Sequence, residues 1–195
     1  MIDPLYAFVF AGLFSPGPNV VMLIASGARF GFAATIPHIL GVAAGVGVTA
    51  GLTGLGLAGI LLAAPVLAAV FKGVSVVWIL YLAWLLFRST RLSRVDDTAR
   101  PFTFGQAVLF QWVNPKVWAI ALAAAGGYPG DGTPLAEGAR LAMAFAGTNL
   151  FVCLFWTFTG HSLTGVLKNQ TYWRVFMTVM AGALAATAIL ILIND

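Results

Sequence analysis

The chain has 195 residues, of which 61% are hydrophobic and only 8% are charged. A soluble domain carries about 25% charged residues, so this composition excludes a soluble globular protein and predicts an integral membrane protein surrounded by lipid. The formal net charge is +4, but no basic patch is interleaved with aromatic residues, so we expect basic loops and no nucleic-acid partner. Cys153 is the single cysteine, which excludes an internal disulfide and predicts a small buried apolar side chain.

Six stretches are apolar enough to cross a membrane, which takes about 20 residues. They cover roughly 4–27, 38–63, 65–87, 106–126, 139–160 and 173–193. The breaks between them are expected at 29–37, 64–65, 88–101, 128–138 and 161–172. Merging the second and third stretches would leave five spans and one implausibly long helix, so a tight hairpin at Pro65 is expected instead. The sequence therefore predicts an all-α membrane protein of six helices that forms one transmembrane domain over residues 1–195. The first segment has no positively charged start, so we expect it to stay in the mature protein.

The basic residues divide unevenly between the two sides of these spans. One side has Arg140, with Lys72 set further inside the third span, whereas the other side has Arg29, Arg88, Arg91, Arg94, Arg100, Lys168 and Arg174. Because Lys and Arg concentrate in cytoplasmic loops, we expect the loop at about 88–105 in the cytoplasm and both termini outside.

Two helix-breaking motifs lie inside apolar spans. A proline there removes a backbone donor, and such a break persists at membrane depth only where protein or a wet cavity surrounds it. At 1.5 Å per residue, Pro16 and Pro115 lie roughly 18 and 14 Å into their spans, near the middle of a core about 30 Å thick. Interrupted helices at corresponding positions of two halves point to a transporter's binding site. The candidate substrate site therefore comprises Pro16, Gly17, Pro18, Asn19, Asn114, Pro115 and Lys116.

Three spans precede the arginine-rich loop and three follow it, so the two halves have opposite orientations. With the matching breaks, this predicts two inverted three-helix repeats, at about 1–87 and 106–195, with broken first and fourth helices. The alternative is chance, because proline is common in membrane helices.

Lys116 is the charged residue expected nearest the bilayer middle, where a lysine costs at least a few kcal/mol. No Asp or Glu lies in any predicted span, so Lys116 either loses its proton, awaits an anionic substrate or snorkels to the interface. The half-helix starting near Asn19 favours a carboxylate, and the freed carbonyls before it can accept hydrogen bonds from an ammonium. The first break thus suits a zwitterion, and Asn19 and Asn114 each add a donor and an acceptor.

Several other polar or small residues allow two interpretations. Asn149 and Trp156 either line the site or pack between helices, and His38 and His161 either couple transport to protons or end helices. The glycines of the second span fit packing within the chain better than a homodimer face, which stays an alternative. No metal-ligand spacing, P-loop or HExxH motif is present. We therefore expect that the protein is not an enzyme and has neither a cofactor nor a metal site.

The chain also resembles a known family in its motifs. Three segments of the chain resemble the N-terminal signature of the LysE/RhtB amino-acid exporters, namely FSPGPN (14–19), GARFG (27–31) and PHILG (37–41). Its second motif resembles QWVNPK (111–116), and the end of its fifth span resembles WTFTGHS (156–162). The resemblance implies efflux of amino acids or close derivatives across the bacterial cytoplasmic (inner) membrane, driven by an ion gradient. The segments 81–84, 147–149 and 160–161 are similar to the cysteine/O-acetylserine exporter branch.

Residues and resemblance together predict a secondary transporter that exports small neutral amino acids, such as cysteine, O-acetylserine, homoserine or threonine, or their derivatives. One alternative is a heavy-metal cation exporter, which would need soft or acidic ligands in the membrane, where Cys153 is the single soft one. The other alternative is a membrane-embedded lipid-handling protein.

Overall fold

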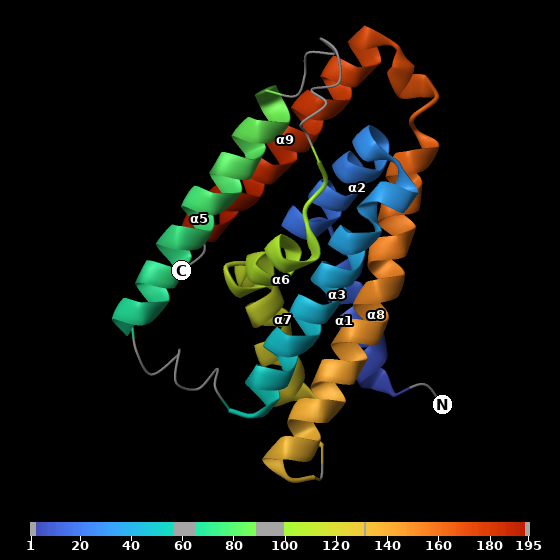
Figure 1. The fold of residues 1–195 in the computed structure, drawn as a ribbon. Helices are drawn as coiled ribbons and strands as arrows, with labels where there is room; N and C mark the ends of the chain where they lie inside the picture. The colour runs from blue at the N-terminus through green and yellow to red at the C-terminus, as the bar shows by residue number, and fades with distance from the viewer. Residues whose placement is uncertain (1–2, 57–64, 89–99, 131, 194–195) are drawn as a thin grey trace.

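The computed structural model describes residues 3–56, 65–88, 100–130 and 132–193 (Figure 1). Within these ranges the chain is helical and contains no strand. The elements in chain order are α1 (Pro4–Phe14), α2 (Pro18–Phe30), α3 (Phe32–Gly54), α5 (Pro65–Arg88), α6 (Phe104–Trp112), α7 (Pro115–Gly127), α8 (Pro134–Ser162), the short 3₁₀ helix η1 (Val166–Lys168) and α9 (Gln170–Ile193).

These helices confirm an all-α membrane protein. Three of them, α3, α8 and α9, are each long and apolar enough to cross a membrane. The pairs α1–α2 and α6–α7 each add one more span if a bent pair counts as one. Helix α5 has 24 residues, or about 36 Å at 1.5 Å per residue, which is long enough for the third predicted span, at 65–87.

The predicted break at residues 29–37 is present but shorter than expected, because helix occupies most of this range. Helix α2 ends at Phe30, and α3 starts at Phe32. Gly31 between them has a φ of 84°, in the left-handed region that glycine adopts without strain. Pro37 lies inside α3, where its missing N–H costs a single hydrogen bond near the helix start. Helix α8 also begins earlier than expected, at Pro134, because the Thr133 side chain accepts from the Ala136 N–H and caps it.

Two of the other breaks, at 64–65 and 88–101, fall partly outside the described residues. The expected hairpin leads into α5, which does begin at Pro65, but residues 57–64 are not described. The same is true of residues 89–99, which include Arg91 and Arg94 of the predicted cytoplasmic loop.

Two long helices, α3 and α8, lie side by side at the centre of the bundle (Figure 1). Helix α3 packs against both α6 and α7, and α8 packs against both α1 and α2. Each broken pair is thus held by the unbroken helix of the other half of the chain. Helices α5 and α9 pair with each other along one side of this assembly (Figure 1).

Glycines allow the central helices to approach closely. A Cβ at Gly45 would lie 2.7 Å from Gln111 Cγ on α6, and one at Gly47 would lie 2.8 Å from Ala146 Cβ on α8. A Cβ at Gly27 would collide with the Thr157 carbonyl oxygen, where α2 crosses α8. The glycines of α3 therefore serve packing within the chain, as the sequence favoured, and a homodimer stays a prediction.

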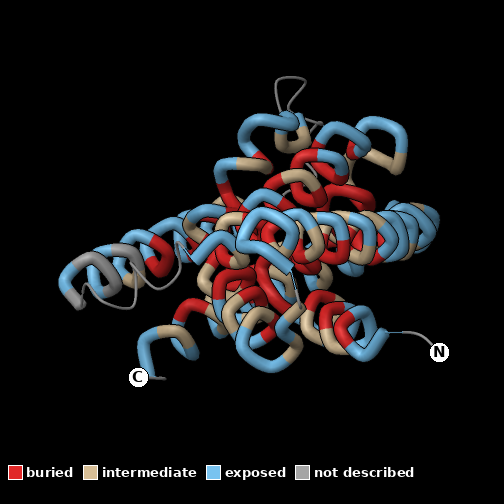
Figure 2. The backbone as a smooth tube through the Cα atoms, turned by 90° about the horizontal axis from the view of Figure 1, so that it is seen from below, coloured by how far each residue is buried: buried red, intermediate tan, exposed pale blue. Residues whose placement is uncertain are grey.

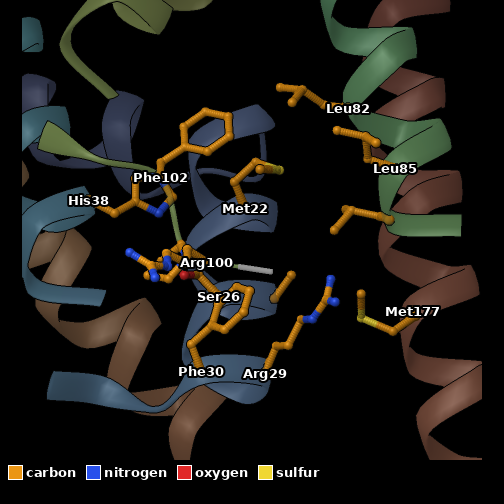
Figure 3. A pocket seen from close by; sticks show the side chains of 13 residues that line it. Met22, Ser26, Arg29, Phe30, His38, Leu82, Leu85, Arg100, Phe102 and Met177 are labelled. Atoms are coloured by element: carbon orange, nitrogen blue, oxygen red, sulfur yellow. The ribbon is translucent and has the colours of Figure 1, made fainter. Parts of the chain in front are cut away.

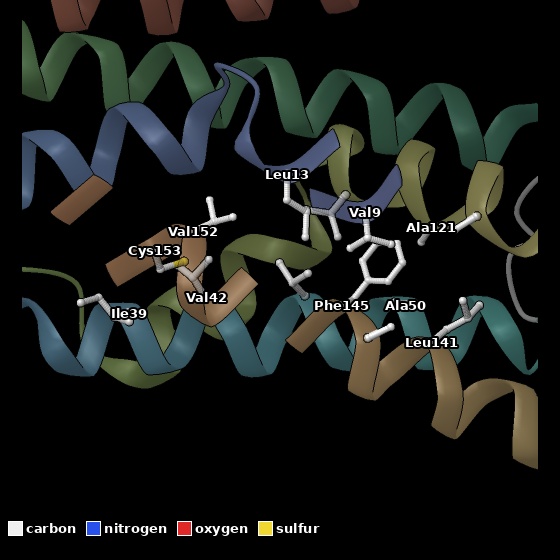
Figure 4. Close-up of a cluster of buried hydrophobic side chains, with 14 of the residues drawn as sticks. Val9, Leu13, Ile39, Val42, Ala50, Ala121, Leu141, Phe145, Val152 and Cys153 are labelled. Atoms are coloured by element: carbon white, nitrogen blue, oxygen red, sulfur yellow. The ribbon is translucent and has the colours of Figure 1, made fainter. Parts of the chain in front are cut away.

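Buried residues alternate with exposed ones along the helices, and the buried ones gather toward the inside of the bundle (Figure 2). One apolar cluster joins α1, α3, α7 and α8 and contains Cys153, which is buried as predicted (Figure 4). A second cluster joins α2, α5, α6 and α9 with the short helix η1. The two broken pairs contribute to both clusters, so their bends lie inside the packed bundle.

The charged side chains differ between the two ends of the bundle. Where α1 and α8 begin, Arg140 pairs with Glu137 at 2.8 Å and with Asp3 at 3.9 Å. The opposite end, where α2 and α5 finish and α9 begins (Figure 1), has among the described residues Arg29, Arg88, Arg100, Lys168 and Arg174.

Candidate substrate site

The first break bends the chain by 62° between α1 and α2. The Ser15 N–H still donates to the Ala11 carbonyl, and Ser15 Oγ donates to the Gly12 carbonyl at 2.8 Å. Pro16 then has no N–H to continue the ladder, and Pro18 occupies the first turn of α2, where a proline is well tolerated. The carbonyls of Ser15 and Pro16 are consequently left without a partner from their own helix.

The second break bends the chain by 63° between α6 and α7, almost the same angle as the first. Pro115 occupies the first turn of α7, which corresponds to the place of Pro18 in α2. The Trp118 indole N–H donates to the Trp112 carbonyl at 3.1 Å and so satisfies one group freed by the bend. The predicted breaks in the first and fourth spans are therefore present, and they have matching bend angles.

Lys116 connects the second break to the first. Its Nζ donates to the carbonyl oxygen of Ser15, and to that of Pro16 at 3.2 Å. The lysine stem lies against Gly17, where a Cβ would come within 2.9 Å of Lys116 Cδ, so a larger residue would displace the lysine. The carbonyls expected to receive a substrate ammonium thus receive the ammonium of Lys116.

A pair of side-chain amides forms a second connection between the breaks. Asn19 Nδ2 donates to Gln111 Oε1 at 2.8 Å, and Gln111 Nε2 donates to Asn19 Oδ1 at 3.2 Å. Gln111 is 0% exposed and also donates to the Ala107 carbonyl at 2.9 Å. Gln111 was missed as a site residue, although an amide one turn before Asn114 in an apolar span was a usable signal.

A small cavity lies between the two breaks, with a volume of about 10 Å³. Its lining consists of Leu13, Gly17, Asn19, Val20, Asn114, Lys116, Val117 and Asn149. Asn114 Oδ1 and Asn149 Nδ2 are buried there without a hydrogen-bond partner among the described residues. A cavity of this size holds at most about one water molecule, and the two unpaired amide groups give it unused hydrogen-bonding capacity.

The remaining predicted site residues lie elsewhere. Trp156 packs its ring against Phe14 at 4.9 Å between centroids, next to the first break but outside the lining of this cavity. His38 lines a different cavity. His161 is exposed in the last turn of α8. The structure therefore brings together Gly17, Asn19, Asn114, Lys116 and Asn149, but neither histidine.

A helical membrane bundle in which two broken helices meet around a polar cluster is typical of a membrane transporter. The chain belongs to the LysE type translocator family, whose family model matches residues 10–195. The family resemblance expected from the motifs is thereby confirmed, and the members of this family are transporters rather than enzymes. Comparison with curated proteins and with solved structures gave no match.

Proposed function

We propose that this transporter exports small neutral amino acids or their derivatives, of the cysteine, O-acetylserine, homoserine or threonine type, from the bacterial cytoplasm. The proposal is carried by the contact of Lys116 with the Ser15 and Pro16 carbonyls, beside a cavity lined by three asparagines. A cation, freed carbonyls and amides within one small site suit a zwitterion with a small side chain. Both termini would face outward in the inner membrane.

An exchange of partners at Lys116 explains how such a site would accept a zwitterion. The substrate carboxylate competes with the Ser15 and Pro16 carbonyls for the Lys116 ammonium, because its full negative charge attracts the ammonium more strongly than a neutral carbonyl dipole does. The carbonyls released in this way can accept hydrogen bonds from the substrate ammonium. Substrate binding and separation of the two breaks are then one event.

Separation of the breaks is also required by space. The cavity of about 10 Å³ is too small for an amino acid, so the broken pairs have to move apart before the substrate enters. The contacts that hold the two breaks together are made by side chains, so their hydrogen bonds can exchange partners while the helices stay intact. We propose alternating access, in which the halves at about 1–87 and 106–195 move relative to each other around the breaks.

Inverted repeats are supported by two correspondences between the halves. The two bends differ by only one degree, at 62° and 63°. Helix α3 packs on both parts of the second broken pair, as α8 does on both parts of the first. Superposing the halves after rotation about an axis in the membrane plane tests this proposal, and a failure to align α1–α2 with α6–α7 would contradict it.

Transport in proteoliposomes tests the proposed function. Vesicles containing the purified protein are loaded with one labelled amino acid at a time, and efflux is measured with and without an imposed pH gradient. We expect efflux of small neutral amino acids and little efflux of large aromatic ones. The pH arm tests proton coupling, for which His38 and His161 are the candidates. An absence of transport across a broad amino-acid panel would overturn the proposal.

A further inference from the structure

A second cavity, with a volume of about 120 Å³, lies between α2, α5, α9 and the segment leading into α6 (Figure 3). It opens near the end of the bundle that carries most of the described basic residues. Its lining consists of Met22, Ala25, Ser26, Arg29, Phe30, His38, Leu82, Leu85, Leu86, Arg100, Pro101, Phe102 and Met177. It is far larger than the cavity between the breaks.

The two sides of this second cavity differ in chemistry (Figure 3). Helices α5 and α9 contribute the apolar side chains Leu82, Leu85 and Met177. The opposite side carries two guanidinium groups, of Arg29 and Arg100, and the lining residues that the structure describes include no carboxylate. The lining thus combines positive charge with an apolar wall.

His38 is an independent sign that this cavity takes a polar ligand. It is 1% exposed, and neither ring nitrogen has a hydrogen-bond partner among the described residues. Its ring packs beside Phe102 at 5.2 Å between centroids, which is a contact that satisfies neither nitrogen. Buried polar groups normally have partners, so a ring with two unused nitrogens beside a cavity points to a ligand.

One face of α2 contributes residues to both the second cavity and the small cavity between the breaks. Asn19 lines the small cavity, whereas Met22, Ser26 and Arg29 line the large one. These residues recur at intervals of three and four, which places them on a single helix face. A ligand in the large cavity would therefore lie along the helix that leads to Asn19.

We propose that the second cavity is a substrate entry site that binds a free amino acid by its carboxylate before the amino acid reaches the breaks. This inference rests on the proposed function. Arg29 and Arg100 bind the carboxylate, because the guanidinium geometry suits planar anions. Ser26 and His38 offer acceptors for the ammonium, and Leu82, Leu85 and Met177 pack against the side chain.

A protection experiment tests the entry site directly. Met22→Cys is introduced into a Cys153→Ala chain, so that the cavity carries the single thiol, and maleimide labelling is followed in sealed vesicles from the side that bears Arg29. A transported amino acid should slow labelling about fivefold or more, whereas its methyl ester, which lacks the carboxylate charge, should not. Lys168→Cys, at the same end but outside the lining, is the control and should label at an unchanged rate.

An anionic lipid headgroup would satisfy the same two arginines, so labelling is repeated in vesicles with and without anionic lipid. Protection that follows the lipid and not the amino acid would overturn the proposal. So would equal protection by the ester, or no protection in a chain that still transports.

Transport kinetics give a second, independent measurement. Arg100→Gln should raise the amino-acid concentration for half-maximal efflux about 3- to 10-fold and leave the maximal rate nearly unchanged, because the loss affects entry alone. Arg174→Gln, which removes another exposed arginine at the same end, should change neither value. Unchanged kinetics in Arg100→Gln would contradict the entry site but not the exporter. An absence of transport in the unaltered chain, with Met22→Cys still protected, would contradict the exporter and leave an amino-acid binding site.

Discussion

Asn19 and Gln111, which lie 92 positions apart in the sequence, exchange two hydrogen bonds through their side-chain amides, at 2.8 and 3.2 Å. Asn19 is the second residue of α2, in one broken pair, and Gln111 is the last but one of α6, in the other. The amide pair and the Lys116 contact therefore join the two breaks from both sides. In the proposed alternating access, opening of the site requires that both connections loosen.

A double-mutant cycle measures the amide pair. Asn19→Ala and Gln111→Ala should each lower stability in detergent, and their coupling energy should be about 0.6 to 1.7 kcal/mol, the range found for hydrogen bonds between membrane helices. Combining Asn19→Ala with Gln170→Ala, on the distant start of α9, should be additive. A cycle without coupling at Asn19 and Gln111 would mean that the pair contributes nothing to joining the breaks.

Lys116→Met should reduce amino-acid efflux roughly 10- to 100-fold, because the carbonyls of Ser15 and Pro16 and the substrate carboxylate all lose a charged donor. The protein should still fold, as judged by its helical circular dichroism and its elution in detergent. Lys168→Met removes an exposed lysine outside the site and should transport normally. Full activity in Lys116→Met would show that this lysine has no role in transport.

Asn149→Leu should separate stability from function. Asn149 is 2% exposed, and its Nδ2 has no partner among the described residues, so an apolar side chain of similar size should leave thermal stability unchanged or higher. The same change removes a donor from the site, so the substrate concentration for half-maximal efflux should rise about tenfold. A loss of stability with unchanged transport kinetics would reverse this assignment and make Asn149 a packing residue.

Two glycines of α8 should respond oppositely to alanine. A Cβ at Gly160 would collide with the Ile24 carbonyl oxygen on α2, so Gly160→Ala should destabilise the protein by about 1 to 3 kcal/mol. A Cβ at Gly147 would have no heavy atom within 4 Å, so Gly147→Ala should be neutral or stabilise by up to about 1 kcal/mol. Thermal unfolding in detergent compares the two, and equal midpoints would exclude close α2–α8 packing at Gly160.

Much of the fold followed from local properties of the sequence. Prolines inside apolar stretches specified where the first and fourth spans break, because a missing N–H acts at its own position. Span boundaries were less predictable. Pro37 was expected to lie before the second span but lies inside α3, because a proline near a helix start costs only one hydrogen bond. The boundary is instead set by Gly31, whose positive φ separates α2 from α3. The family was also recognisable from these motifs.

The partners of the polar residues depended on the tertiary structure. The sequence by itself determined that Lys116 and Asn19 belong to breaks at a similar depth, because helical rise converts residue number into distance along the span. Only the packing of α3 and α8 on the opposite broken pairs decided that Lys116 reaches the Ser15 carbonyl and that Gln111 faces Asn19. A side chain's partner across the bundle depends on how helices rotate and approach, and residue spacing along one helix does not contain that information.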